Sequence, residues 1–166
     1  NADGNFQNLP LSMLDPMLTT VVSQTAGRAD ARLNIAGEGR MAKLNGEVKV
    51  TDLSTMVDFT RARYLVPSAT VKVENNHFIA NNVRVNDTEQ NSGTFTMDLS
   101  LDHLSNIAYN MRVVPRNMIV LNTTAQDNDL FYGKVYGSGT ATIEGDKSGT
   151  TLDITGTTQG NSQFFM

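Results

Sequence analysis

Apolar and polar residues alternate along most of this chain. In the segment 95–101, Phe, Met, Leu and Leu occupy every second position, and Thr, Asp and Ser lie between them. A period of two is typical of a strand with one apolar and one polar face. Similar short segments, separated by polar turn signals, predict about nine or ten strands from about residue 28 to the end of the chain. The pattern therefore predicts an all-β domain built as a sandwich, a barrel or a curved sheet.

Two departures from the plain alternation carry further predictions. Leu53 is out of step with the apolar positions of 44–50, which indicates a bulge or corner near Asp52. In the segment 131–143, glycines fill the middle of the apolar face between bulky ends. Glycine weakens a strand, so this run predicts that another chain or a ligand approaches closely there. The turn at 145–149 then predicts a hairpin.

Only one segment has helical spacing. Asp15 and Pro16 are suited to a helix start, as an N-cap and a first-turn proline. Apolar residues follow at helical spacing as far as Val22, and Gly27 is placed to end the helix. We expect a helix over about 16–25 that caps one end of the apolar core. Residues 1–11 have no clear period, and we expect them to form an extended segment that leads into the helix.

Composition narrows the class of protein. The chain has 166 residues, a net charge of −4 and 18% charged residues, so it fits one domain and lacks the basic surface of a nucleic-acid binder. It has no cysteine, which excludes disulfides and thiolate metal sites. No apolar run approaches the roughly 20 residues of a membrane span. Because the chain starts at Asn1, we expect a mature chain or a piece of a longer one.

No motif predicts catalysis. His77 and His103 lie apart, without a second ligand at metal-binding spacing, and are expected to be solvated. The acidic segment 127–129 lacks the later glycine and glutamate of a calcium loop. The glycines of 137–139 lie within a predicted strand rather than between a strand and a helix, so they do not predict a phosphate site. We expect no enzyme activity, metal or cofactor.

The predicted strands carry far more apolar surface than one short helix can cover. Fully burying one apolar side chain is worth about 1.5 to 3 kcal/mol. The apolar face must therefore close on itself, on another domain or on an apolar ligand.

The segment Val120–Ala141, with the core LNTT…DNDLFYGKVYGSG, resembles the TamB family of translocation and assembly proteins in its Bacteroidetes form. The segments 9–14 (LPLSML), 44–48 (LNGEV), 152–155 (LDIT) and 163–165 (QFF) fit the same pattern. The likeness covers most of the chain and implies an internal or C-terminal section of such a protein.

The resemblance implies a curved, mostly antiparallel sheet that forms a taco-like trough with an apolar interior. It implies a periplasmic protein, tethered to the inner membrane by an N-terminal helix that we expect to lie outside this section. The expected function is phospholipid transport between membranes, outer-membrane protein assembly, or both. The expected partners are phospholipid or acyl chains, a BamA-like outer-membrane barrel and neighbouring sections of the same chain. The family has no catalytic motif to transfer.

On this picture, apolar strand faces line a groove for lipid. The predicted lining consists of Leu33, Ile35, Leu44, Val48, Val50, Val57, Phe59, Phe95, Met97, Leu99, Leu101, Ile107, Tyr109, Met111, Val113, Phe131, Val135, Ile143, Leu152 and Ile154. Two other hypotheses stay open. One is a free sheet edge that pairs with nascent barrel strands. The other is a sealed structural or adhesive β-domain of a cell-envelope protein, in which the same residues form an ordinary core.

Overall fold

The structure is a computed structural model that describes residues 1–18, 22–102 and 106–166. About three quarters of the chain is β-strand. The strands are β1 (Ala2–Pro10), β2 (Val22–Ala36), β3 (Lys43–Val57), β4 (Ala62–Glu74), β5 (His77–Asp87), β6 (Ser92–Asp102), β7 (Asn106–Val114), β8 (Met118–Thr123), β9 (Tyr132–Asp146), β10 (Gly149–Thr158) and β11 (Gln163–Phe165). The short helices are η1 (Leu11–Leu14), α1 (Asp15–Leu18) and η2 (Gly39–Met41).

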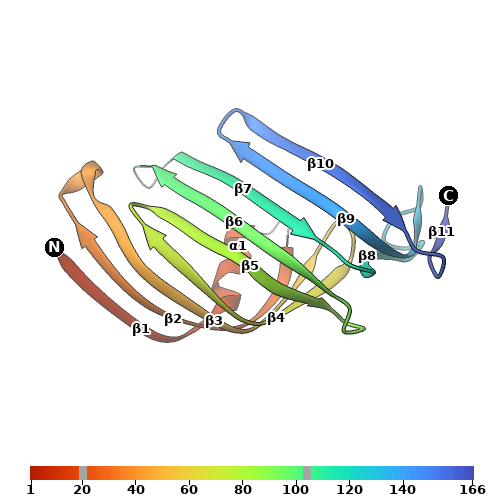
Figure 1. Cartoon of the computed structure of the whole chain (residues 1–166), viewed down its shortest axis with the longest axis horizontal. Helices are drawn as coiled ribbons and strands as arrows, with labels where there is room; N and C mark the ends of the chain where they lie inside the picture. Colours follow the sequence, from red (N-terminus) through yellow and green to blue (C-terminus); the bar gives the residue numbers. More distant parts are fainter. Residues whose placement is uncertain (19–21, 103–105) are drawn as a thin grey trace.

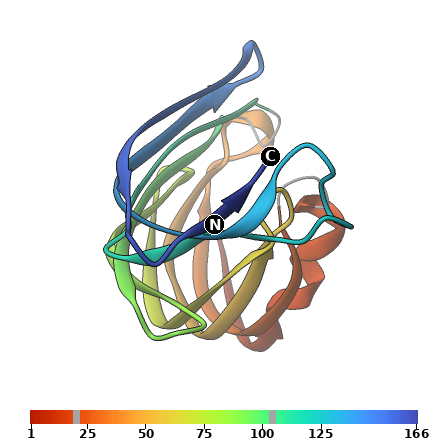
Figure 2. The same ribbon diagram turned by 90° about the vertical axis from the view of Figure 1, so that its right-hand side faces the viewer.

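All strands belong to one antiparallel sheet. Its order is β1-β2-β3-β4-β5-β6-β7-β9-β10, and β8 and β11 pair with β9 beside this path. The two ends of the path, β1 and β10, lie on opposite sides of the molecule (Figure 1). Figure 2 shows that the sheet curls without closing on itself. The predicted fold class, a curved open antiparallel trough with one short helix near its N-terminal end, is confirmed.

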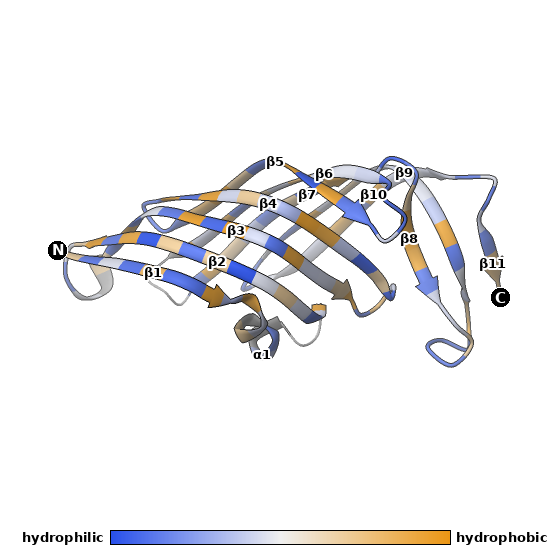
Figure 3. Ribbon diagram, turned by 90° about the horizontal axis from the view of Figure 1, so that it is seen from below, coloured by the Kyte–Doolittle hydropathy of each residue, from blue (hydrophilic) through white to orange (hydrophobic). Residues whose placement is uncertain are grey.

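The predicted alternation lines up from strand to strand, and Figure 3 shows it along β1 to β4 as bands of opposite hydropathy. We define the central row as the apolar residues that follow one another across the sheet. They are Phe6, Ala31, Val48, Val71, Ala80, Met97, Met111, Ile143 and Leu152. Val71 and Ala80 are the chain neighbours of the paired residues Lys72 and Ile79. The face that carries this row is the inner face.

Several strands bend in the middle, where the inward positions change from one parity to the other. In β3, Val50 and Leu53 both lie on the inner face, and Asp52 between them has a φ of 52°. This confirms the corner predicted near Asp52. The register shifts in β1 and β5 lie beside Asn8, with φ 58°, and Asn82, with φ 49°. Such bulges bend a strand and re-aim its side chains, so these bends curve the sheet.

The predicted helix over 16–25 is wrong in its extent. The helix α1 ends at Leu18, and β2 already begins at Val22; residues 19–21 lie outside the described part. Pairing with β3 over 22–26 outweighs the weak preference of a short helix, which is marginal by itself. The Asp15 carboxylate accepts a hydrogen bond from the backbone N–H of Thr25, at 3.2 Å, in place of the expected cap. The segment that was expected to be an extended lead-in forms strand β1.

Candidate functional site

The candidate site is the inner face of one half of the trough. We call the half of the trough that contains the turns β2–β3, β4–β5 and β9–β10 the open half. Beyond the central row, a second row of paired residues crosses the open half through all nine strands of the path. Its members are Gly4, Leu33, Gly46, Val73, Phe78, Leu99, Tyr109, Gly145 and Thr150. Neither row contains a charged side chain, so together they form a continuous, almost wholly apolar surface.

This apolar surface is accessible at its margins, while Ala31, Val73 and Ala80 within the two rows are buried. Large side chains of the inner face are about half exposed in the open half: Ile35 at 45%, Ile107 at 52% and Leu152 at 59%. A shallow cavity of about 430 Å³ lies along β1 to β3, where Gly4 and Gly46 flank Leu33. The outer face of the same strands is polar, with contacts such as that between Lys49 and Glu47 at 3.6 Å.

The other end of the trough, which we call the closed half, is filled by the chain itself. The strand β8 lies against β4 and β5 there. Its Met118 is 1% exposed and packs on Val66, Val83 and Val85 of the inner face. On the other side of β8, Ile119 packs with Ala62 and Tyr136. The closed half therefore has an ordinary buried core.

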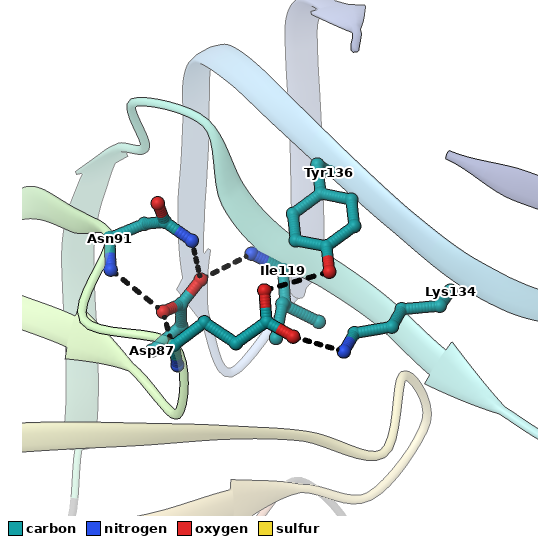
Figure 4. A network of polar contacts seen from close by, with 6 residues as sticks. Asp87, Asn91, Ile119, Lys134 and Tyr136 are labelled. Atoms are coloured by element: carbon teal, nitrogen blue, oxygen red, sulfur yellow. Dashed lines mark hydrogen bonds and ion pairs between the residues drawn. The ribbon is translucent and has the colours of Figure 1, made fainter. Parts of the chain in front are cut away.

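A buried carboxylate fastens β8 in place. Asp87 is fully buried at the end of β5, and Figure 4 shows its contacts with Asn91 and Ile119. Its Oδ1 accepts hydrogen bonds from the backbone N–H groups of Glu89 at 2.8 Å and Asn91 at 2.9 Å. Its Oδ2 accepts from the Asn91 side-chain amide at 2.9 Å and from the Ile119 backbone N–H at 2.8 Å. The carboxylate thus has four donors, as a buried charge requires.

Two further polar contacts support this junction. The Tyr64 hydroxyl donates to the Ile119 carbonyl oxygen at 2.9 Å. Burial, and next the negative charge of Asp87, raise the pKa of Tyr64 to about 12. Glu89 accepts a hydrogen bond from the Tyr136 hydroxyl at 2.8 Å and pairs with Lys134. The Lys134 contact, followed by that of Tyr136, holds the pKa of Glu89 below its usual value.

Aromatic side chains gather at the closed end, beside the turn after β3 and the strand β11. Phe131 lies between Phe59 and Phe164, with ring centroids 6.1 and 6.2 Å away. Phe59 lies in the turn after β3 and is 71% exposed. Beside this cluster, the Asp127 carboxylate accepts from the Thr124 backbone at 2.8 Å and lies 3.1 Å from Arg61. Asp127 therefore organises a loop, in place of the calcium site that the sequence already disfavoured.

Most of the predicted lining residues lie on the inner face. Those placed there by strand pairing are Leu33, Ile35, Leu44, Val48, Val50, Phe95, Met97, Leu99, Leu101, Ile107, Tyr109, Met111, Val113, Ile143, Leu152 and Ile154. Val57 pairs with Ala62 in the closed half. Phe59 and Phe131 are in this aromatic cluster at the closed end, and Val135 is buried where β9 pairs with β8, so these three do not line the open half.

Two large inner-face residues, Phe6 and Phe78, are absent from the predicted lining. Phe6 lies in a segment with no clear period, and Phe78 directly follows a turn and His77. Phe78 pairs with Val73 and Leu99, both on the inner face. A signal for it existed, since apolar residues opposite a turn of two residues face the same side of a hairpin.

The glycine run has a different role from the one expected. A Cβ at Gly137 would lie 3.1 Å from the Val120 side chain of β8. A Cβ at Gly139 would lie 2.2 Å from the Thr155 carbonyl oxygen in β10. The close approach that the glycines permit is therefore made by neighbouring strands of this same chain.

Among the described residues, no group of three or more His, Cys, Asp or Glu side chains is placed to hold a metal ion. His77 lies on the outer face with its Nδ1 3.0 Å from Asp98 Oδ1. His103 lies outside the described residues. No helix of the described chain has the length and apolar character of a membrane span.

The fold and site define an open antiparallel β-trough that is plugged at one end. Comparison with known proteins gave no match for the chain among protein-family models, curated proteins or solved structures.

Proposed function

We propose that this chain is a non-enzymatic section of a cell-envelope protein, and that its open half holds the acyl chains of phospholipids. The observation that carries the proposal is the inner face of the open half, which stays apolar through nine strands and keeps Phe6, Ile35 and Leu152 about half exposed. Acyl chains require continuous apolar surface and no specific polar partner. A trough of this kind satisfies that requirement without a catalytic or metal-binding residue.

The energetics favour an occupant. Each large apolar side chain gains about 1.5 to 3 kcal/mol when it passes from full exposure to full burial. Ile35, Ile107 and Leu152 keep about half of their surface in water, and an acyl chain would cover part of it. The central row carries no positive charge for a headgroup, so the headgroup is expected to stay at the solvent side of the trough.

The resemblance of Val120–Ala141 to the TamB family supports the biological setting of the proposal. In that setting the chain is periplasmic and belongs to a bridge between the inner and outer membranes. Neighbouring sections of the same protein continue the bridge, a helix elsewhere in the protein tethers it, and a BamA-like barrel is its outer-membrane partner.

Between lipid transport and outer-membrane protein assembly, the geometry favours lipid transport. The uncovered apolar side chains lie on the inner face, where a flexible chain fits, while the exposed strand β10 is rich in threonine. A sealed structural or adhesive domain would cover its own inner face. The closed half has that character, with Met118 and Ile119 almost fully buried.

The test is the lipid content of the purified chain. We expect phospholipid in an organic extract of the native protein by mass spectrometry. Ile143→Asp places a charge in the central row, and Thr142→Asp places the same charge one residue away on the outer face, between Arg112 of β7 and Asp153 of β10. The proposal predicts that Ile143→Asp loses the lipid while Thr142→Asp keeps it, with both variants folded by circular dichroism. Absence of lipid from the native protein, or equal lipid in both variants, would contradict it.

A further inference from the structure

The two edges of the sheet are built differently. The β1 edge contains Pro10 and a register shift between Phe6 and Leu9, with Asn8 at φ 58°. Proline and bulges protect an edge against pairing with another chain. In contrast, all ten residues of β10 pair with β9 without a register shift, and they contain no proline and one charge, Asp153. The edge of β10 is therefore flat and unprotected.

The hydrogen-bonding direction of β10 follows from two contacts at its end. The N–H of Gln159 donates to the Tyr136 carbonyl oxygen of β9 at 2.9 Å. The N–H of Gly139, which is opposite Gly156, instead points away from β10 to the Pro115 carbonyl oxygen at 3.2 Å. Because the direction alternates along an antiparallel ladder, the N–H and C=O groups of Leu152, Ile154 and Gly156 face the free edge.

The same positions carry apolar side chains. Leu152 and Ile154 pair with Ile143 and Ala141, so they end two rows of the inner face at this edge. They are 59% and 66% exposed. A strand added beside β10 would therefore satisfy their backbone groups and cover their side chains in one step.

We propose that the edge of β10 pairs with β10 of a second copy of this chain, antiparallel and about a two-fold axis perpendicular to the sheet. A two-fold contact uses the same surface on both copies. This axis keeps both inner faces on the same side, so the apolar rows run through the junction. Along the antiparallel path β1 and β10 point the same way, so stacking copies in tandem would need a parallel pair, which is slightly less stable per residue.

The side chains of β10 select the register of this pairing. A register centred on Asp153 sets two carboxylates directly opposite, which is destabilising. A register centred on Leu152 places Asp153 opposite Thr151, and one centred on Ile154 places it opposite Thr155. In either register, the central apolar residue lies opposite the same residue of the second copy. The inference predicts one of these two registers.

The first test is the mass of the lipid-free chain by sedimentation. We expect a species at twice the 18.1 kDa mass of one chain. Ile154→Pro removes an edge-facing N–H from each copy, and proline is tolerated on an edge strand. Loss of two symmetric hydrogen bonds predicts self-association weaker by about tenfold or more. Ile154→Ala keeps both N–H groups and should associate better than Ile154→Pro. A native chain that stays monomeric, or a dimer unaffected by Ile154→Pro, would overturn the inference.

The second test uses the absence of native cysteine. Leu152→Cys or Ile154→Cys should form a disulfide between two copies, because directly opposite residues in an antiparallel pair lie within disulfide reach. Phe6→Cys is the matched control on the β1 edge and should stay reduced. Crosslinking through Phe6→Cys alone would overturn the inference. Since neither test contains lipid, a dimer would stand even where the proposed lipid function fails.

Discussion

The two halves of β9 show how one strand serves two environments. Its first half, around Tyr136, pairs with β8 and β11 in the closed half and is buried. Its second half, around Ile143, pairs with β7 and β10 and carries the central row into the open half. The alternation continues through both, so strand pattern alone does not decide burial. The difference comes from β8, which pairs with the first half of β9 and not with the second half.

This comparison separates residues that stabilise the protein from residues available to a ligand. In the closed half, Met118 and Asp87 have no exposed surface to offer and complete a core. In the open half, Ile107 and Leu152 keep about half of theirs. Substitutions in the two halves should therefore act on different properties, namely folding stability in the closed half and lipid occupancy in the open half.

The largest effect on stability is expected at Asp87. Asp87→Ala leaves the buried N–H of Ile119 and the partly buried donors of Asn91 without their acceptor, and each unsatisfied buried donor costs about 1 to 3 kcal/mol. We expect the free energy of unfolding, measured with urea, to fall by about 3 to 5 kcal/mol. Asp98→Ala removes a half-exposed carboxylate of the outer face and should change it by about 0.5 kcal/mol or less. Equal effects would erase the distinction between the halves.

The next largest effect on stability is expected from a comparison of two methionines, one in each half. Met118→Ala empties a fully buried site and should cost about 2 to 5 kcal/mol of unfolding free energy. Met111→Ala lies in the central row, is only partly buried and should cost about 1 kcal/mol or less, since water already reaches its side chain. Urea denaturation of the two variants tests the comparison. A larger loss for Met111→Ala would show that the open half is covered in solution.

Tyr64 reports on the closed half at high pH. The chain has four tyrosines, and the pKa of Tyr64 is raised from 10.0 to about 12. A raised folded-state pKa contributes stability below pH 10.0 that is lost as the pH rises through about 12. Ultraviolet titration should show one late tyrosine step, absent in Tyr64→Phe. A late step that persists in Tyr64→Phe would assign it elsewhere and remove this support for the Tyr64–Ile119 contact.

The smallest effect is expected from Glu89, which is exposed. The pKa of Glu89 is lowered from 4.5 by Lys134 and Tyr136, so its contribution is present above pH 4.5 and is lost as the pH falls through the lowered pKa. The urea midpoint of the native chain should therefore fall slightly more on acidification than that of Glu89→Gln. Identical pH profiles would show that the contact with Lys134 adds nothing in solution.

The sequence predicted the regular parts of the molecule and missed those set by long-range contacts. The alternation around Met97 and the corner at Asp52 are local features, so a window of a few residues contains them. The closed half depends on the packing of β8 against β5. Asp87 is buried there because its carboxylate binds the backbone of Ile119, 32 residues away. In the sequence, Asp87 belongs to a polar segment that is typical of an exposed loop. Strand β1 was missed because its pairing with β2, rather than its own weak pattern, makes it a strand.

The most direct test of the central claim is site-specific photo-crosslinking of the native chain to phospholipid. A crosslinking side chain would be placed in turn at Met97, Met111 and Ile143 of the inner face, and at their outer-face neighbours Thr96 and Thr142. If acyl chains occupy the open half, lipid adducts form at the three inner positions and none form at the two outer positions. Adducts at inner and outer positions alike, or at neither, would contradict the claim that the open half of the trough holds acyl chains.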